Sequence, residues 1–114
     1  MRKLLTVHTL LFMVSFNLSA QSYGELWKQV DVARGKDLPK TQLTVLKKIV
    51  SKAQKEKSYG NLLAAELLTS SLQTQISPDS VDTEKARLKE LCDKTEKTDK
   101  ILHAVYCCAL GKLF

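Results

Sequence analysis

The sequence predicts an all-α fold of about five helices arranged in antiparallel hairpins. After residue 20, apolar residues recur at three- and four-residue spacing through most of the chain, which is the pattern of amphipathic helices. Apolar and polar residues alternate nowhere for more than a few positions, so nothing favours strands. The four glycines and two prolines are spread thinly, and several mark points where one helix should end and another begin.

Residues 1–20 are expected to be an export signal. A positive start (Met1 to Lys3) precedes a nearly uncharged apolar run, and Leu18-Ser19-Ala20 fits the small-residue rule for cleavage before Gln21. The alternative is a retained membrane anchor, which the shortness of the run and the lack of a basic stop disfavour. We expect residues 21–114 to be released into the periplasm or cell envelope, or secreted, without stable membrane insertion.

The first hairpin follows from capping residues and a buried stripe. Ser22 should cap a helix from Tyr23 to Arg34, and Gly35 suits a left-handed residue after it. Pro39 suits the first position of a second helix that runs to about Lys57. The residues expected on its buried stripe are Leu43, Leu46, Ile49, Val50 and Ala53.

Three more helices are expected beyond a turn at residues 58–61. The helix Leu62–Ile76 is apolar over so wide an arc that neighbours should cover it on two sides. Ser77 and Pro78 predict the start of a fourth helix that reaches about Lys97. Thr98 should cap a fifth helix that begins at Asp99.

Two features suggest a helical repeat. Ser22-Tyr23-Gly24 recurs 36 residues later as Ser58-Tyr59-Gly60, and the two prolines are 39 residues apart. A hairpin repeat of this length is typical of tetratricopeptide-like α-solenoids, although most of that consensus is missing here. A plain five-helix bundle is the alternative.

The last expected helix ends without a polar closing surface. Solenoids close with a helix whose outer face is polar, whereas this one is apolar to its end. We therefore expect residues 21–114 to be a domain that is incomplete at its C-terminus. Downstream domains of a longer chain, or a partner protein, should cover the last helix. The expected interaction residues are Tyr106, Leu110, Leu113 and Phe114.

The cysteines and one histidine are the residues with potential site chemistry. Cys92 can pair with Cys107 or Cys108, one thiol is left over, and buried apolar thiols are the simpler interpretation. Asp99, His103 and Cys107 have the spacing of metal ligands on a helix. Such spacing is frequent by chance, so no metal or cofactor is predicted. His103 could also activate Cys107 as a nucleophile, but the chain has no glycine-rich loop that would stabilise an oxyanion. We therefore expect a protein that is not an enzyme.

Lysines crowd the second helix, at positions 40, 47, 48, 52, 55 and 57. Nucleic-acid surfaces usually interleave arginines and aromatic residues with lysines, and this stretch has neither. A solvated helix face is therefore favoured, and no nucleic-acid partner is predicted. Trp27 and Tyr23 are expected in the core rather than in an exposed recognition patch.

Several segments together resemble a known family. They are Ser22–Val30, Lys36–Thr41, Ser58–Leu63, Ile76–Ser80, Ala104–Tyr106 and Leu110–Lys112. The chain is similar to the extreme N-terminus of the large alpha-2-macroglobulin-like proteins of Bacteroides and related bacteria. The resemblance implies a helical region that precedes the β-sandwich domains of a protease-trapping protein.

The family's covalent trapping motif, a Cys-Gly-Glu-Gln thioester, is absent from this chain. The expectation is therefore a non-catalytic exported scaffold or docking module, without the thioester. An alternative is an independent exported adaptor that binds a partner helix through residues 101–114. A third is a small thiol or metal protein that uses Cys92, His103, Cys107 and Cys108.

Overall fold

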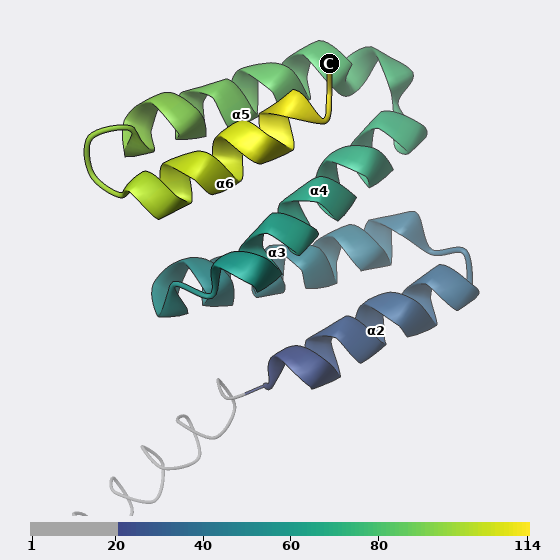
Figure 1. Ribbon diagram of the computed structural model, residues 1–114. Coiled ribbons are helices and arrows are strands. Elements are labelled where there is room, and N and C mark those ends of the chain that lie inside the picture. Colours follow the sequence, from purple (N-terminus) through teal and green to yellow (C-terminus); the bar gives the residue numbers. More distant parts are fainter. Residues whose placement is uncertain (1–20) are drawn as a thin grey trace, which may run out of the picture.

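The computed structural model describes residues 21–114, so the expected export signal lies outside the described residues (Figure 1). The described part is all-helical, as predicted, and contains no strand. Its elements are α2 (Tyr23–Gly35), α3 (Pro39–Glu56), α4 (Tyr59–Ile76), the 3₁₀ helix η1 (Pro78–Ser80), α5 (Val81–Thr95) and α6 (Lys100–Gly111). Consecutive helices run back and forth, and α4 lies between the hairpin α2–α3 and the hairpin α5–α6 (Figure 1).

Local chemistry accounts for the first hairpin. The Ser22 hydroxyl accepts a hydrogen bond from the Glu25 backbone N–H at 3.2 Å, which caps α2 as predicted. Pro39 occupies the first turn of α3, also as predicted. Gly35 is still helical and has no positive φ, whereas Asp37 takes the left-handed conformation in the connection. The prediction that Gly35 would be left-handed was therefore wrong.

The connection between α3 and α4 is shorter than predicted. Lys57 adopts a left-handed conformation with φ 55°, and its backbone N–H bonds the Ala53 carbonyl. This single residue turns the chain, so α4 already begins at Tyr59, whereas residues 58–61 were expected to be a turn. The Asn61 side chain donates to the Ser58 hydroxyl at 2.8 Å and ties the entry to the helix.

The last hairpin also begins and ends differently from the prediction. A 3₁₀ turn precedes α5, and α5 ends at Thr95 rather than near Lys97. Asp99, not Thr98, is the N-cap of α6. Its carboxylate accepts hydrogen bonds from two backbone N–H groups of the first turn, which a threonine hydroxyl at position 98 does not reach.

Two apolar clusters hold the helices together. The first joins α2, α3 and one side of α4, and its buried members are Leu26, Val30, Val45, Leu46, Ile49, Ala65 and Leu72. The second joins α4, α5 and α6 around the end of α3, and its buried members are Ala53, Leu62, Leu88, Cys92, Val105, Tyr106 and Ala109. Thus α4 contributes to both clusters, which explains why its sequence is apolar over so wide an arc.

The two Ser-Tyr-Gly segments occupy similar local positions. Tyr23 opens α2 and Tyr59 opens α4. Each phenol donates to a carboxylate further along the chain, from Tyr23 to Glu56 at 2.9 Å and from Tyr59 to Asp99 at 3.0 Å. The arrangement of the hairpins as a tetratricopeptide-like repeat stays a prediction.

Candidate functional site

The three cysteines lie on α5 and α6, the last two helices. Cys92 of α5 is bonded to Cys107 of α6, and their Cα atoms are 5.6 Å apart. Cys108 is exposed and carries a free thiol. Adjacent residues of a helix point about 100° apart, so one of the pair Cys107 and Cys108 faces α5 while the other faces outward. The interpretation of all three as buried thiols is therefore wrong.

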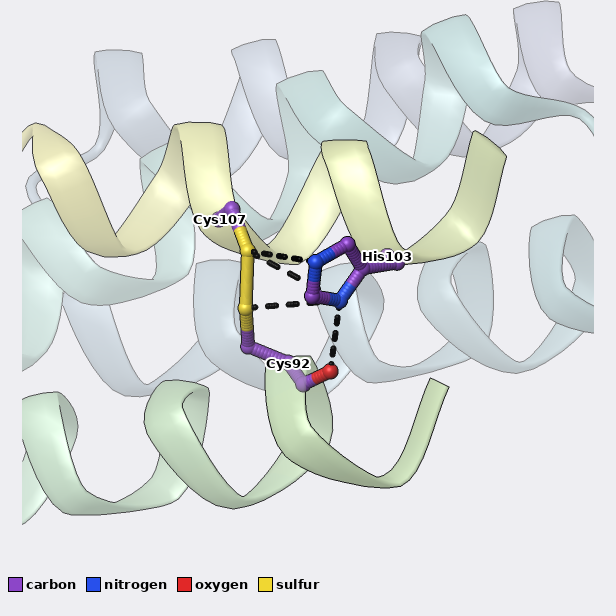
Figure 2. A group of neighbouring side chains, drawn as sticks. All are labelled: Cys92, His103 and Cys107. Carbon is purple, nitrogen blue, oxygen red and sulfur yellow. Dashed lines mark hydrogen bonds between the residues drawn. A yellow bond between two sulfur atoms is a disulfide. The ribbon is translucent and has the colours of Figure 1, made fainter. Parts of the chain in front are cut away.

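His103 lies beside the disulfide, one turn before Cys107 (Figure 2). Its Nδ1 is 2.7 Å from the Cys92 carbonyl oxygen. Because a carbonyl oxygen accepts and never donates, Nδ1 carries the hydrogen in this contact, and in the neutral imidazole Nε2 then has the free lone pair. Nε2 lies 3.6 Å from the Cys107 Sγ. The imidazole is thus held in one orientation, with its basic nitrogen beside a sulfur atom.

Asp99 does not join this cluster, although its spacing suggested that it would. It precedes α6 in extended conformation, with φ −151°, so the four-residue spacing of a helical face does not apply to it. Its Oδ1 accepts from the backbone N–H groups of Ile101 and Leu102, each at 3.1 Å. These bonds, foremost the one from Leu102, and the bond from Tyr59 hold the pKa of Asp99 below its usual value despite partial desolvation. The candidate ligand group predicted from spacing was therefore wrong about Asp99. The residues that the structure brings together are Cys92, His103 and Cys107.

The expected interaction residues of the last helix divide into two groups. Tyr106 is buried, with 1% of its surface exposed, and its hydroxyl accepts a hydrogen bond from Gln54 Nε2 at 2.7 Å. Leu110 and Leu113 are half-buried against the second apolar cluster. Tyr106 is thus a core residue and not part of an open surface. Burial raises the pKa of its phenol.

Phe114 differs from these three residues because 86% of its surface is exposed. The Lys85 ammonium group lies 4.4 Å from the centre of its ring, as in a cation–π contact. Phe114 therefore rests near α5 on the outside of the hairpin rather than in the core.

A different face of α6 is exposed and largely apolar. It is formed by Ile101, Ala104 and Cys108, and we call it the α6 outer face. Ile101 exposes 57% of its surface. The four interaction residues expected from the sequence lie outside this face because the rotation of the helix was not known, although the range 101–114 of the adaptor alternative includes it. The bond from Cys107 to α5 fixes that rotation, and a confident assignment of that pairing would have found the face.

A buried polar network joins α4 to α5, and sequence reasoning did not anticipate it. Arg87 Nη2 lies 2.8 Å from Glu66 Oε2 and 3.0 Å from Glu84 Oε2, and the Ser70 hydroxyl donates to Glu84 at 2.9 Å. Burial lowers the pKa of Arg87, but its hydrogen bonds to the two glutamates outweigh that effect and raise it. Both carboxylates are buried, so the network is a structural link between the helices. The one feature of the sequence that could have indicated it is Glu66, a single acidic residue in an otherwise apolar helix.

The lysines of α3 lie on its solvent side, as the interpretation of a solvated face supposed. Lys47, Lys48 and Lys55 are exposed, and Lys52 pairs with Glu56 at 3.0 Å. Trp27 is half-buried against the first apolar cluster and donates its Nε1–H to Asn61 Oδ1 at 2.8 Å. The tryptophan therefore serves packing between α2 and α4 rather than an exposed patch.

Across residues 21–114, none of the helices combines the length and the apolar character needed to cross a membrane. Comparisons of the chain with models of protein families, with curated proteins and with solved structures found no match. The similarity to alpha-2-macroglobulin-like proteins therefore remains an expectation from the sequence.

Proposed function

We propose that this chain is a non-catalytic, exported docking module that binds an amphipathic helix with acidic flanks on the α6 outer face. The bound helix belongs to a separate protein or to a downstream domain of a longer chain. This is the role expected for the helical N-terminal region of an alpha-2-macroglobulin-like protein, which the sequence resembles.

The observation that carries the proposal is the exposure of apolar side chains along one side of α6. Within residues 100–111 the helix buries Val105, Tyr106 and Ala109, which lie on the side of the helix next to this face. Ile101 nonetheless keeps 57% of its surface exposed, and Ala104 and Cys108 are exposed beside it. Helices normally turn their apolar side chains inward, and apolar surface that stays outside is typical of interaction sites.

The charges around this face determine the kind of partner. The segment from residue 100 to residue 114 contains two lysines, Lys100 and Lys112, and no acidic side chain. Both lysines are exposed, one at each end of the helix. A partner helix that carries Glu or Asp beside its apolar stripe would pair with them and would be favoured over a basic one. Ala104 and Gly111 are small and allow a second helix to approach closely.

Two further observations support an exported protein that does not perform catalysis. Disulfides such as Cys92–Cys107 form and persist in oxidising compartments outside the cytosol. In its oxidised form this bond also occupies the two thiols nearest His103, so neither sulfur is available as a nucleophile.

The test is binding of a designed helical peptide to the purified full chain. The peptide has a Leu and Ala stripe with Glu flanks, it carries a fluorescent label, and its anisotropy reports binding. The substitution Ile101→Lys should weaken binding at least about tenfold, which corresponds to about 1.4 kcal/mol. The matched control is Val32→Lys on α2, because Val32 is a similarly exposed β-branched residue far from α6 in the fold; it should leave binding unchanged. A peptide of the same stripe with Lys flanks should bind more weakly.

Three results would contradict the proposal. The first is equal weakening by the two substitutions, and the second is no preference for acidic flanks. The third is sedimentation that shows a dimer which Ile101→Lys dissociates, together with no peptide binding. That last result would assign the α6 outer face to a second copy of this chain.

A further inference from the structure

Cys92, His103 and Cys107 form a compact group of potential metal ligands. One ligand atom from each residue lies within 4.8 Å of the other two. Figure 2 shows the imidazole beside the two bonded sulfur atoms, with α5 supplying Cys92 and α6 supplying the other two residues. We propose that, when the disulfide is reduced, these three residues form a binding site for a thiolate-preferring divalent metal ion such as Zn²⁺. The disulfide and the metal are then mutually exclusive states of one site.

The position of the imidazole already suits such an ion. A tetrahedral zinc site with Zn–S of about 2.3 Å and Zn–N of about 2.0 Å places its sulfur and nitrogen ligands about 3.5 Å apart. His103 Nε2 and Cys107 Sγ are 3.6 Å apart. These two ligands therefore need little movement, whereas the two bonded sulfurs must move apart before both can bind the ion.

The hydrogen bond that His103 makes through Nδ1 also supports a metal site. Histidine ligands of metals usually donate their second ring N–H to a carboxylate or a backbone carbonyl, which fixes the tautomer and the ring plane. His103 makes such a bond from Nδ1 to the Cys92 carbonyl at 2.7 Å. The bond leaves Nε2 as the free ligand atom, on the side of the ring that faces Cys107.

The surrounding helices keep the three residues close after the bond is cleaved. His103 and Cys107 are one turn apart on the same helix, so their spacing does not depend on the disulfide. Leu88 of α5 and Val105 of α6 belong to the same buried cluster as Cys92. Because His103 and Cys107 are half-buried, an ion can enter from solvent, and the fourth coordination position remains open.

The chemistry balances with a named reductant. A water-soluble phosphine takes the oxygen of one water molecule and becomes a phosphine oxide. Its electron pair cleaves the Cys92–Cys107 bond, and the two protons of that water end on the two sulfurs. Zn²⁺ then displaces both thiol protons, so binding releases two protons and the two thiolates neutralise the ion.

The experiment titrates Co²⁺, as a coloured substitute for Zn²⁺, into the full chain before and after phosphine treatment. The reduced chain should bind one ion and show a thiolate-to-cobalt charge-transfer band together with the visible bands of tetrahedral Co²⁺. Zn²⁺ should remove these bands. The oxidised chain should show none of them.

Variants locate the ion. His103→Ala and Cys107→Ser should each lower the affinity of the reduced chain at least about tenfold. Cys108→Ser is the matched control because that thiol is exposed and unpaired, and it should bind as the unaltered chain does.

The proposal is wrong if the reduced chain gives no thiolate band, if His103→Ala binds Co²⁺ normally, or if Cys108→Ser loses the band. Should circular dichroism show that reduction unfolds the chain, Zn²⁺ must restore its helicity. Failure to do so also overturns the proposal. None of these outcomes depends on the docking function.

Discussion

The first and last hairpins of the described chain are held together by different means. In α2–α3 the contact consists mainly of aliphatic side chains such as Leu46 and Ile49, both with no exposed surface, with one hydrogen bond from Tyr23 to Glu56. In α5–α6 the Cys92–Cys107 bond joins the helices, while the Arg87 network and the contact between Tyr106 and Gln54 tie the hairpin to α4 and α3.

The helices α3 and α6 also differ in what they leave on the surface. The solvent side of α3 is rich in lysine, and its apolar residues mostly face the core. The helix α6 leaves Ile101, Ala104 and Cys108 outside. The last hairpin also buries its share of the second apolar cluster, and the disulfide and the polar network add to that packing. The comparison teaches that the last hairpin has a disulfide and a buried polar network in addition to its apolar packing, while one side of α6 stays exposed.

The largest expected effect lies in the first hairpin. Leu46→Ala should lower the free energy of unfolding by about 4 kcal/mol, because a fully buried leucine leaves a cavity when it is truncated. Leu38→Ala, at a residue with 44% of its surface exposed, should cost much less. Urea unfolding followed by circular dichroism measures both variants. Similar losses for the two would show that the first hairpin does not depend on its buried core.

The next effect concerns the covalent link of the last hairpin. Replacing Cys92 and Cys107 together by serine should cost about 3 kcal/mol, the usual contribution of a disulfide that spans this loop length; the two cysteines are 15 residues apart. Cys108→Ser is the control and should leave stability unchanged, since that thiol is exposed. Calorimetry of the three proteins gives the values. An unchanged melting temperature in the double variant would contradict the account of the last hairpin.

The polar network should give a smaller effect. Arg87→Met leaves two buried carboxylates without their cation and should cost about 2 kcal/mol, less than a fully buried pair because Arg87 is partly exposed. Adding Glu66→Gln and Glu84→Gln to that variant should restore most of the loss. Lys89→Met, which removes an exposed pair with Asp93, should have almost no effect. A triple variant less stable than Arg87→Met would contradict this explanation.

The smallest effect depends on pH and involves Asp99. Its pKa is lower in the folded chain than in the unfolded chain, so its contribution is fully present above the ordinary aspartate value of about 3.9 and is lost as pH falls through the lower folded value. Asp99→Asn keeps a capping side chain but does not titrate. The stability difference between the unaltered chain and this variant should therefore shrink toward acid pH. A constant difference between pH 7 and strongly acid pH would show that the charge of Asp99 does not contribute.

The fold could be predicted from the sequence where local chemistry decides the outcome. Helical periodicity gave the fold class, and Ser22 and Pro39 marked helix starts that the structure confirms. The prediction was wrong where a residue without strong preference took an unusual conformation. Lys57 is left-handed, although neither its type nor its neighbours indicated this.

The site was harder to predict because it depends on the rotation of α6. Spacing alone placed Asp99, His103 and Cys107 on one face, but Asp99 lies just outside the helix. Cys92 completes the group from a different helix, and only the packing of α5 against α6 shows this. The same packing exposes Ile101 and buries Tyr106, which was expected on the interaction surface.

The most direct test of the central claim is the labelling rate of Cys108, since this exposed thiol lies within the α6 outer face. A thiol reagent is added to the oxidised full chain with and without a saturating amount of the acidic-flanked helical peptide. The account predicts that the bound peptide slows labelling at least about tenfold, and that Ile101→Lys abolishes this protection. An unchanged labelling rate while anisotropy shows the peptide fully bound would place the peptide elsewhere and contradict the account.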